Sequence, residues 1–161
     1  MKKLLSLLAA LLVISGLTAC AAETEEAPDV IKIGVNLELT GDVSVYGVPE
    51  RNAFEQAVSE VNAKGGIDGK LVELVIYDNA YDQAKAVQNT EKLIEDGVVA
   101  ILGSATSGMT MAIAPLAKDN GLVVFTPSGT NSAVTMDGDV VNPYVFRSCF
   151  IDPYQGQVLA N

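Results

Sequence analysis

Short apolar runs alternate with longer segments of helical periodicity along most of the chain after residue 30. Each run is rich in Val, Ile and Leu and has the length of a β-strand. The run at 98–102 is hydrophobic throughout, which favours a strand covered on both faces. The predicted strands span residues 31–39, 71–77, 98–102, 122–126 and 140–148.

Amphipathic helices are predicted between the strands, because apolar residues recur there at i, i+3, i+4 and i+7. Two helices are expected at about 83–96 and 108–119, and Pro115 predicts a kink in the latter. Asp152 and Pro153 suit the cap and first turn of a last helix. An earlier helix, which the glycine pair at 65–66 should stop, is marked by Phe54, Ala57, Val58 and Val61.

Five strands joined by four crossovers, most of them helical, predict an α/β fold. The expected architecture is a parallel sheet with helices on both faces, of the Rossmann-like or flavodoxin-like kind. Ligands of such sheets bind beyond the carboxyl ends of the strands. Three polar loops are expected there, at 40–47, 103–108 and 127–132.

These loops are suited to a small anion or zwitterion. The second leads directly into a helix, so Ser107 can donate from its N–H and its hydroxyl at the positive end of the helix dipole. Alternatively, Ser107 or Thr106 only caps that helix. Thr130 follows Gly129 and can donate a further bond, or be an ordinary turn residue. Tyr46 offers an aromatic wall, although an exposed loop tyrosine is equally common.

Composition argues against catalysis and against nucleic acid as a partner. The chain has no His and neither glycine-rich phosphate motif, and its formal net charge is −10. Ser107 and Ser128 lie outside any G-x-S-x-G sequence. Asp78 and Asp82 resemble a carboxylate pair, but such residues more often cap the next helix. We therefore expect binding without chemistry, and neither cofactor nor metal.

The N-terminus resembles an export signal. Two lysines and an apolar stretch predict a signal peptide at 1–19. Its end, Leu17-Thr18-Ala19-Cys20, resembles the lipobox of bacterial lipoproteins, which implies a lipid on Cys20 and an acidic tether at 20–29. The alternative is a plain secretory signal in which Cys20 occurs by chance. Cys149 lies among apolar residues and has no other partner if Cys20 is acylated, so it is expected to be a small buried core residue.

Several motifs after residue 30 carry a resemblance to a known family. The N-A-K-G-G-I-D-G-K sequence at 62–70, with the loops that follow it, is specific. Further matches lie at 31–35, 39–41, 46–47, 57–61, 77–79, 103–107, 125–130 and 146–147, with Asp152 and 155–156. In these motifs the chain resembles the branched-chain amino-acid-binding proteins, solute receptors of ABC importers with the type 1 periplasmic-binding fold.

The resemblance implies roles for particular residues. Those matching Ser107 and Thr130 hold the ligand carboxylate, with Thr130 also near the ammonium. The residue matching Ser128 offers its carbonyl to the ammonium, and the tyrosine matching Tyr46 lines the side-chain pocket. The implied protein is an extracytoplasmic receptor, anchored to the membrane by lipid, that delivers aliphatic amino acids to an ABC permease.

The resemblance also defines departures and alternatives. Some family members have a disulfide whose cysteines would fall at Tyr81 and Thr106, so hydrogen bonds and packing must hold this loop here. Residues 30–161 match only the N-terminal of two lobes, and a single lobe is expected to bind weakly or not at all. The same fold could instead bind amides, urea or aromatic acids, or act as a ligand sensor. An extracellular hydrolase lipoprotein is the third possibility.

Overall fold

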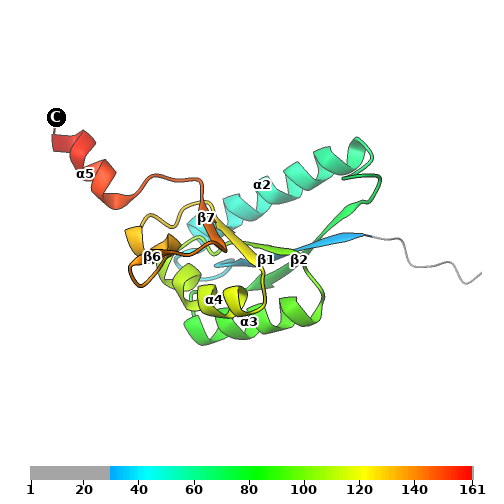
Figure 1. Ribbon diagram of the computed structural model, residues 1–161. Helices are drawn as coiled ribbons and strands as arrows, with labels where there is room; N and C mark the ends of the chain where they lie inside the picture. The colour runs from blue at the N-terminus through cyan, green and yellow to red at the C-terminus, as the bar shows by residue number, and fades with distance from the viewer. Residues whose placement is uncertain (1–29, 161) are drawn as a thin grey trace, which may run out of the picture.

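A five-stranded parallel sheet forms the centre of the protein (Figure 1). The computed structural model describes residues 30–160, so the predicted signal peptide, Cys20 and the tether lie outside the described residues. The sheet consists of β1 (Ile31–Leu37), β2 (Val72–Asp78), β3 (Ala100–Leu102), β4 (Val123–Thr126) and β7 (Val145–Arg147). Their spatial order is β2-β1-β3-β4-β7, which confirms the predicted parallel α/β sheet.

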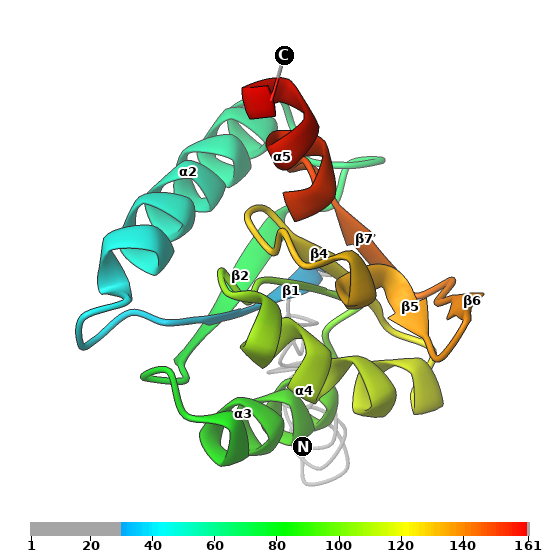
Figure 2. The ribbon, with the colours of Figure 1, turned by 90° about the vertical axis from the view of Figure 1, so that its left-hand side faces the viewer.

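Helices cover both faces of this sheet (Figure 2). One long helix lies on one face, and two helices that pack against each other lie on the opposite face. The last helix extends away from the sheet and has no buried residue. The helices are α2 (Ser44–Ala63), α3 (Gln83–Glu95), α4 (Ser107–Asp119), α5 (Asp152–Ala160) and the 3-10 helix η1 (Ser132–Thr135), and α2 is the one that lies alone.

Each face of the sheet has its own hydrophobic core. The larger core joins α3 and α4 to the sheet, and Leu93, Ile101 and Ile113 are fully buried in it. The smaller core lies under α2, where Leu37 is fully buried and Phe54 only partly. Each Å² of buried apolar surface contributes about 25 cal/mol to stability, so the core under α3 and α4 contributes more than the core under α2.

Glycines allow α2 to start and stop where it does. A Cβ on Gly47, in the first turn, would lie 2.2 Å from the carbonyl oxygen of Glu38. The missing side chain therefore lets α2 approach the end of β1 closely. The helix ends at Ala63, before the predicted glycine pair, and Gly66 has a φ of +79° with no room for a Cβ beside the Lys70 carbonyl.

The predicted strand at 140–148 is wrong in its length. It is divided into β6 (Val140–Val141), which forms an antiparallel pair with β5 (Met136–Asp137), and β7 in the main sheet. Asn142 separates the two parts because its N–H bonds the Thr135 carbonyl and its side chain accepts from the Tyr144 N–H. Pro143, which follows, has no N–H for a ladder.

Three smaller expectations are also corrected. The loop at 40–47 is shorter than predicted, because α2 begins at Ser44 and Tyr46 lies in its first turn. Asp152 is the first helical residue of α5, and the Ile151 carbonyl accepts the first N–H bonds of that helix. Cys149 is a free, half-buried thiol and no core residue, and it lies between exposed Ser148 and Phe150 after the end of β7.

None of the helices within residues 30–160 combines the length and the apolar character needed to span a bilayer.

Candidate functional site

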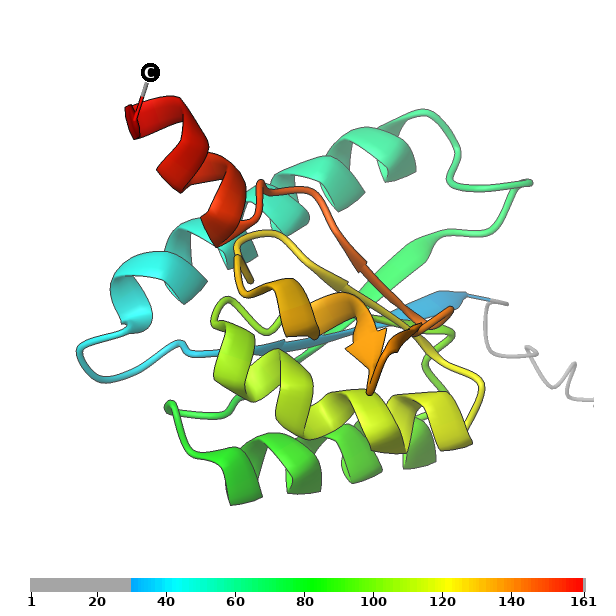
Figure 3. The same cartoon turned by 60° about the vertical axis from the view of Figure 1, so that its left-hand side comes forward.

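A hollow of about 330 Å³ lies at the carboxyl ends of the central strands. The start of α2, the start of α4 and the loop after β4 converge at this end of the sheet (Figure 3). All four residues that the sequence analysis assigns to a ligand site lie in the lining of this hollow, and their role in binding stays a prediction. It is lined by Tyr46, Ala105, Thr106, Ser107, Ser128 and Thr130.

Ser107 is the first residue of α4 and is placed to donate a hydrogen bond into the hollow. Its Oγ accepts from the Asn131 N–H at 3.1 Å, so the hydroxyl proton is free for another acceptor. Thr106 is the N-cap residue, but its side chain makes no capping bond. The alternative that either residue merely caps the helix is therefore wrong. The first N–H groups of α4 have no acceptor within the helix and face an anion favourably.

Glu38 fixes the loop before α4, and the sequence analysis missed it. Its carboxylate is completely buried at the end of β1. It accepts bonds from the Ala105 N–H at 2.9 Å, the Thr106 N–H at 3.1 Å and the Thr106 hydroxyl at 2.6 Å. Such charge-assisted bonds are about twice as strong as neutral ones. Glu38 thus ties down the loop that lacks the cysteine implied at Thr106.

Arg147 fixes the loop that carries Thr130. Its guanidinium donates to the Gly129 carbonyl at 3.1 Å, the Asn131 carbonyl at 2.7 Å and the Ser132 carbonyl at 3.3 Å. The Thr130 carbonyl accepts from the first N–H of α5 at 3.1 Å. Five donors in a rigid planar fork suit a guanidinium to this task. The loop is therefore held from β7 and from α5.

A buried polar network connects the two site loops below the hollow. The Thr126 hydroxyl donates to the Ser104 carbonyl at 2.7 Å and accepts from the Gly129 N–H at 3.0 Å. The Ser104 hydroxyl donates to the Asn36 carbonyl at 2.9 Å, and the Asn79 side-chain amide donates to that carbonyl and to the Ser104 hydroxyl. Buried networks whose members are satisfied make a region rigid. The spacing between the loops is thus fixed without any ligand.

Ser128 lies at one side of the hollow, next to a second carboxyl group that the sequence analysis did not identify. Its Oγ is 2.5 Å from Oε1 of Glu50, one helical turn after Tyr46, and 2.7 Å from the Ala105 carbonyl. Burial, and to a smaller extent the charge of Glu38, raise the pKa of Glu50 above its ordinary value, against the opposing effect of the Ser128 bond.

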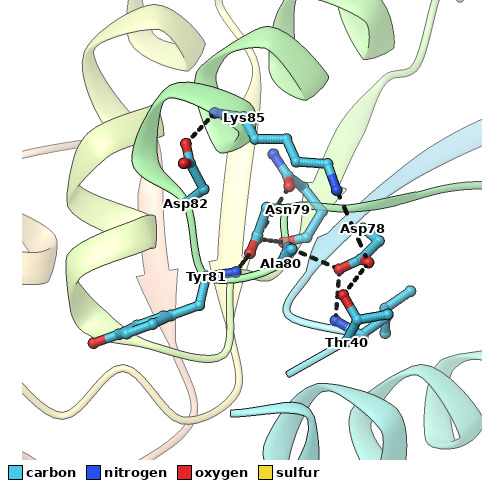
Figure 4. A network of polar contacts seen from close by, with 9 residues as sticks. Thr40, Asp78, Asn79, Ala80, Tyr81, Asp82 and Lys85 are labelled. Atoms are coloured by element: carbon cyan, nitrogen blue, oxygen red, sulfur yellow. Dashed lines mark hydrogen bonds and ion pairs between the residues drawn. The ribbon is translucent and has the colours of Figure 1, made fainter. Parts of the chain in front are cut away.

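Asp78 and Asp82 organise the loop after β2 (Figure 4). Asp82 caps α3 by accepting from the Lys85 N–H at 2.9 Å, as its alternative role predicted. Burial would raise the pKa of Asp78, but hydrogen bonds and a nearby positive charge lower it overall. The bonds come from the Thr40 hydroxyl and from the N–H groups of Leu39 and Ala80, and the charge is that of Lys85. Both carboxylates therefore stabilise local structure.

No group of three or more potential metal ligands is found among residues 30–160. The donors around the hollow are hydroxyls and backbone amides, and aromatic surface lies beside them. This combination suits a small molecule that has a carboxylate and an apolar part.

Comparison with known proteins places this geometry in context. A family model described as periplasmic binding protein matches residues 30–160. The chain is 32% identical over 148 residues to the leucine-specific-binding protein of Salmonella typhimurium, and the match covers 92% of this chain and 39% of that protein. It is 35% identical over 132 residues to the leucine-, isoleucine-, valine-, threonine-, and alanine-binding protein of Pseudomonas aeruginosa, covering 82% and 35%.

A solved structure shows the same similarity in three dimensions. The branched-chain amino acid transporter substrate-binding protein LivJ from Streptococcus pneumoniae, in complex with isoleucine, matches with a TM-score of 0.76 and 39% identity. The match covers 82% of this chain and 37% of that one. The chain thus spans little more than a third of the length of the relatives it matches.

Proposed function

Because the chain belongs to the periplasmic binding protein family, we propose that it is the extracytoplasmic solute-binding component of an ABC importer. Its ligand is a branched-chain or similar aliphatic amino acid, and it performs no catalysis. One observation carries the proposal: Tyr46, Ser107, Ser128 and Thr130 line one hollow although they come from three separate segments. The relatives that bind leucine or isoleucine support the choice of ligand.

Each end of an amino acid has a complementary surface in this hollow. The Ser107 hydroxyl and the first N–H groups of α4 would hold the carboxylate at the positive end of the helix dipole. The Thr130 hydroxyl and the Ser128 carbonyl would bind the carboxylate and the ammonium respectively, with Thr130 also close to the ammonium. Tyr46, whose side chain is 58% exposed, would contact the aliphatic part.

An NMR titration tests the proposal even if binding is weak. Leucine added to the ¹⁵N-labelled protein should shift the amide resonances of Ser107, Thr130 and their neighbours. Ser107→Ala and Thr130→Ala should each weaken binding by about 1–3 kcal/mol, the value of a lost charge-assisted bond. Ser59→Ala removes an exposed hydroxyl from the same protein and serves as the control. Shifts confined to another surface would contradict the assignment.

The domain organisation proposed here follows the same function. Residues 1–19 would direct export, Cys20 would carry the lipid, residues 20–29 would form the tether, and 30–161 the ligand-binding lobe that presents the amino acid to a membrane permease. Metabolic labelling with palmitate in a bacterial host tests the anchor. Label should be incorporated into the wild-type protein and lost in Cys20→Ser, and equal labelling of both would exclude this cysteine as the lipid site.

A further inference from the structure

The Ser128 hydroxyl has one hydrogen and two close oxygen neighbours. Its Oγ lies 2.5 Å from Oε1 of Glu50 and 2.7 Å from the carbonyl oxygen of Ala105. A hydroxyl donates one bond and accepts others, whereas a carbonyl and an ionised carboxylate can only accept. Both short contacts are hydrogen bonds only if a proton sits on Glu50. In that arrangement Glu50 donates to Ser128, and Ser128 donates to Ala105.

We propose that Glu50 is protonated and donates a hydrogen bond to the Ser128 hydroxyl. This bond directs the Ser128 hydroxyl toward the Ala105 carbonyl beneath the ligand. Glu50 is then a positioning residue, because it lies outside the lining of the hollow and acts through Ser128. The inference rests on the proposed amino-acid site for its effect on affinity. The location of the proton can be measured without any ligand.

The surroundings of the second carboxyl oxygen support a protonated Glu50. Its Oε2 is buried and has no hydrogen-bond partner within the described residues. An ionised carboxylate would place charge on this unpaired oxygen, which is costly away from water. Burial raises the pKa of Glu50 for the same reason.

The charged groups near Glu50 also favour the neutral form. Glu38, at the end of β1, is the carboxylate whose charge raises the pKa of Glu50, after burial itself. The loops at 103–107 and 127–131 that pack beside Glu50 contain no ionisable side chain. On α2, Arg51 is directed to Glu55 at 3.8 Å. The charge that acts on the pKa of Glu50 is thus that of another carboxylate, which disfavours ionisation.

The two carboxyl groups beside the site thus have different surroundings. Both oxygens of Glu38 accept bonds from backbone or hydroxyl donors. Glu50 has one bonded oxygen and one unpaired oxygen. When Glu50 loses its proton, Ser128 must donate to it and leave the Ala105 carbonyl. The bond that ties Ser128 to the Ala105 carbonyl is then lost, and the Ser128 carbonyl is held less firmly for the ligand ammonium. Leucine affinity should therefore decrease as the pH rises through the pKa of Glu50.

A carboxyl titration of the ligand-free protein tests where the proton lies. The ¹³C resonance of the Glu50 side chain, assigned by its loss in Glu50→Gln, should titrate at a higher pH than the ordinary range of a glutamate, about 4.3. Titration at or below that ordinary value would overturn the inference. This readout is independent of ligand, so it stands even if leucine does not bind and the proposed function fails.

Leucine titrations of the same variants test the positioning role. Gln at position 50 can donate to Ser128 as the protonated acid does, so Glu50→Gln should match the low-pH affinity of the wild type and lose its decrease with pH. Glu50→Ala should bind about 5-fold more weakly at low pH, as a lost neutral bond predicts. Glu55→Gln should keep the wild-type profile. A pH profile in Glu50→Gln equal to that of the wild type would overturn the inference.

Discussion

Replacing Glu38 by Ala should destabilise the protein strongly, because the carboxylate is buried and holds three donors of the site loop. Bonds to a charged group contribute about 1.5–3 kcal/mol each. The values do not add fully, because half-buried Thr106 can regain water whereas Ala105 is only 3% exposed. We expect a loss of about 3–5 kcal/mol, most of it from N–H groups left without an acceptor.

Urea unfolding followed by circular dichroism measures this loss. Glu38→Gln has nearly the same volume but presents one amide oxygen and an NH₂ group, so it should recover part of the loss and remain about 2 kcal/mol below the wild type. Glu73→Gln, an exposed position on β2, is the matched control and should be neutral. Hydrogen exchange at the Ala105 and Thr106 amides should accelerate in Glu38→Ala. A loss below about 1 kcal/mol in Glu38→Ala would refute the role assigned to this carboxylate.

Two further predictions concern stability. Gly47→Ala should lower the free energy of urea unfolding by at least about 1–3 kcal/mol, because its Cβ would lie 2.2 Å from the Glu38 backbone oxygen. The control is Gly156→Ala, whose Cβ meets nothing within 4 Å and should cause no clash. Equal effects of the two substitutions would contradict the close approach of α2. The lowered pKa of Asp78 means that its stabilisation is present above the unfolded-state pKa and is lost as the pH falls through the folded-state pKa. Acid unfolding should therefore be less steep in Asp78→Asn, and also weakened in Thr40→Ala, which removes one donor; unchanged acid profiles would show that these bonds do not set the pKa.

The sequence was sufficient to predict the sheet and to bring the four site residues together. Parallel strands place their carboxyl ends at one edge, so polar loops after several strands must be neighbours whatever their separation in the chain. That rule alone joined Ser107 to Thr130. Tyr46 was placed in a loop and lies in the first turn of α2, but the same rule still put it at the correct end.

The residues that hold the site could not be predicted in the same way. Glu38 contacts donors 67 and 68 positions away, and Glu50 meets Ser128 across 78 positions. A Glu that ends an apolar strand has no local signal to distinguish a buried acceptor from an exposed charge. Arg147 was visible only as part of a family motif, and its carbonyl partners lie 15 to 18 residues earlier. Such pairings depend on tertiary packing that periodicity does not encode.

The bond between the first N–H of α5 and the Thr130 carbonyl has a mechanical consequence. That helix buries none of its side chains, so little packing energy resists its displacement. The carbonyl it holds belongs to a residue that lines the hollow. A tilt of α5 would therefore strain the Thr130 loop while both hydrophobic cores stay intact, and occupancy of the hollow would in turn alter how freely the helix tilts.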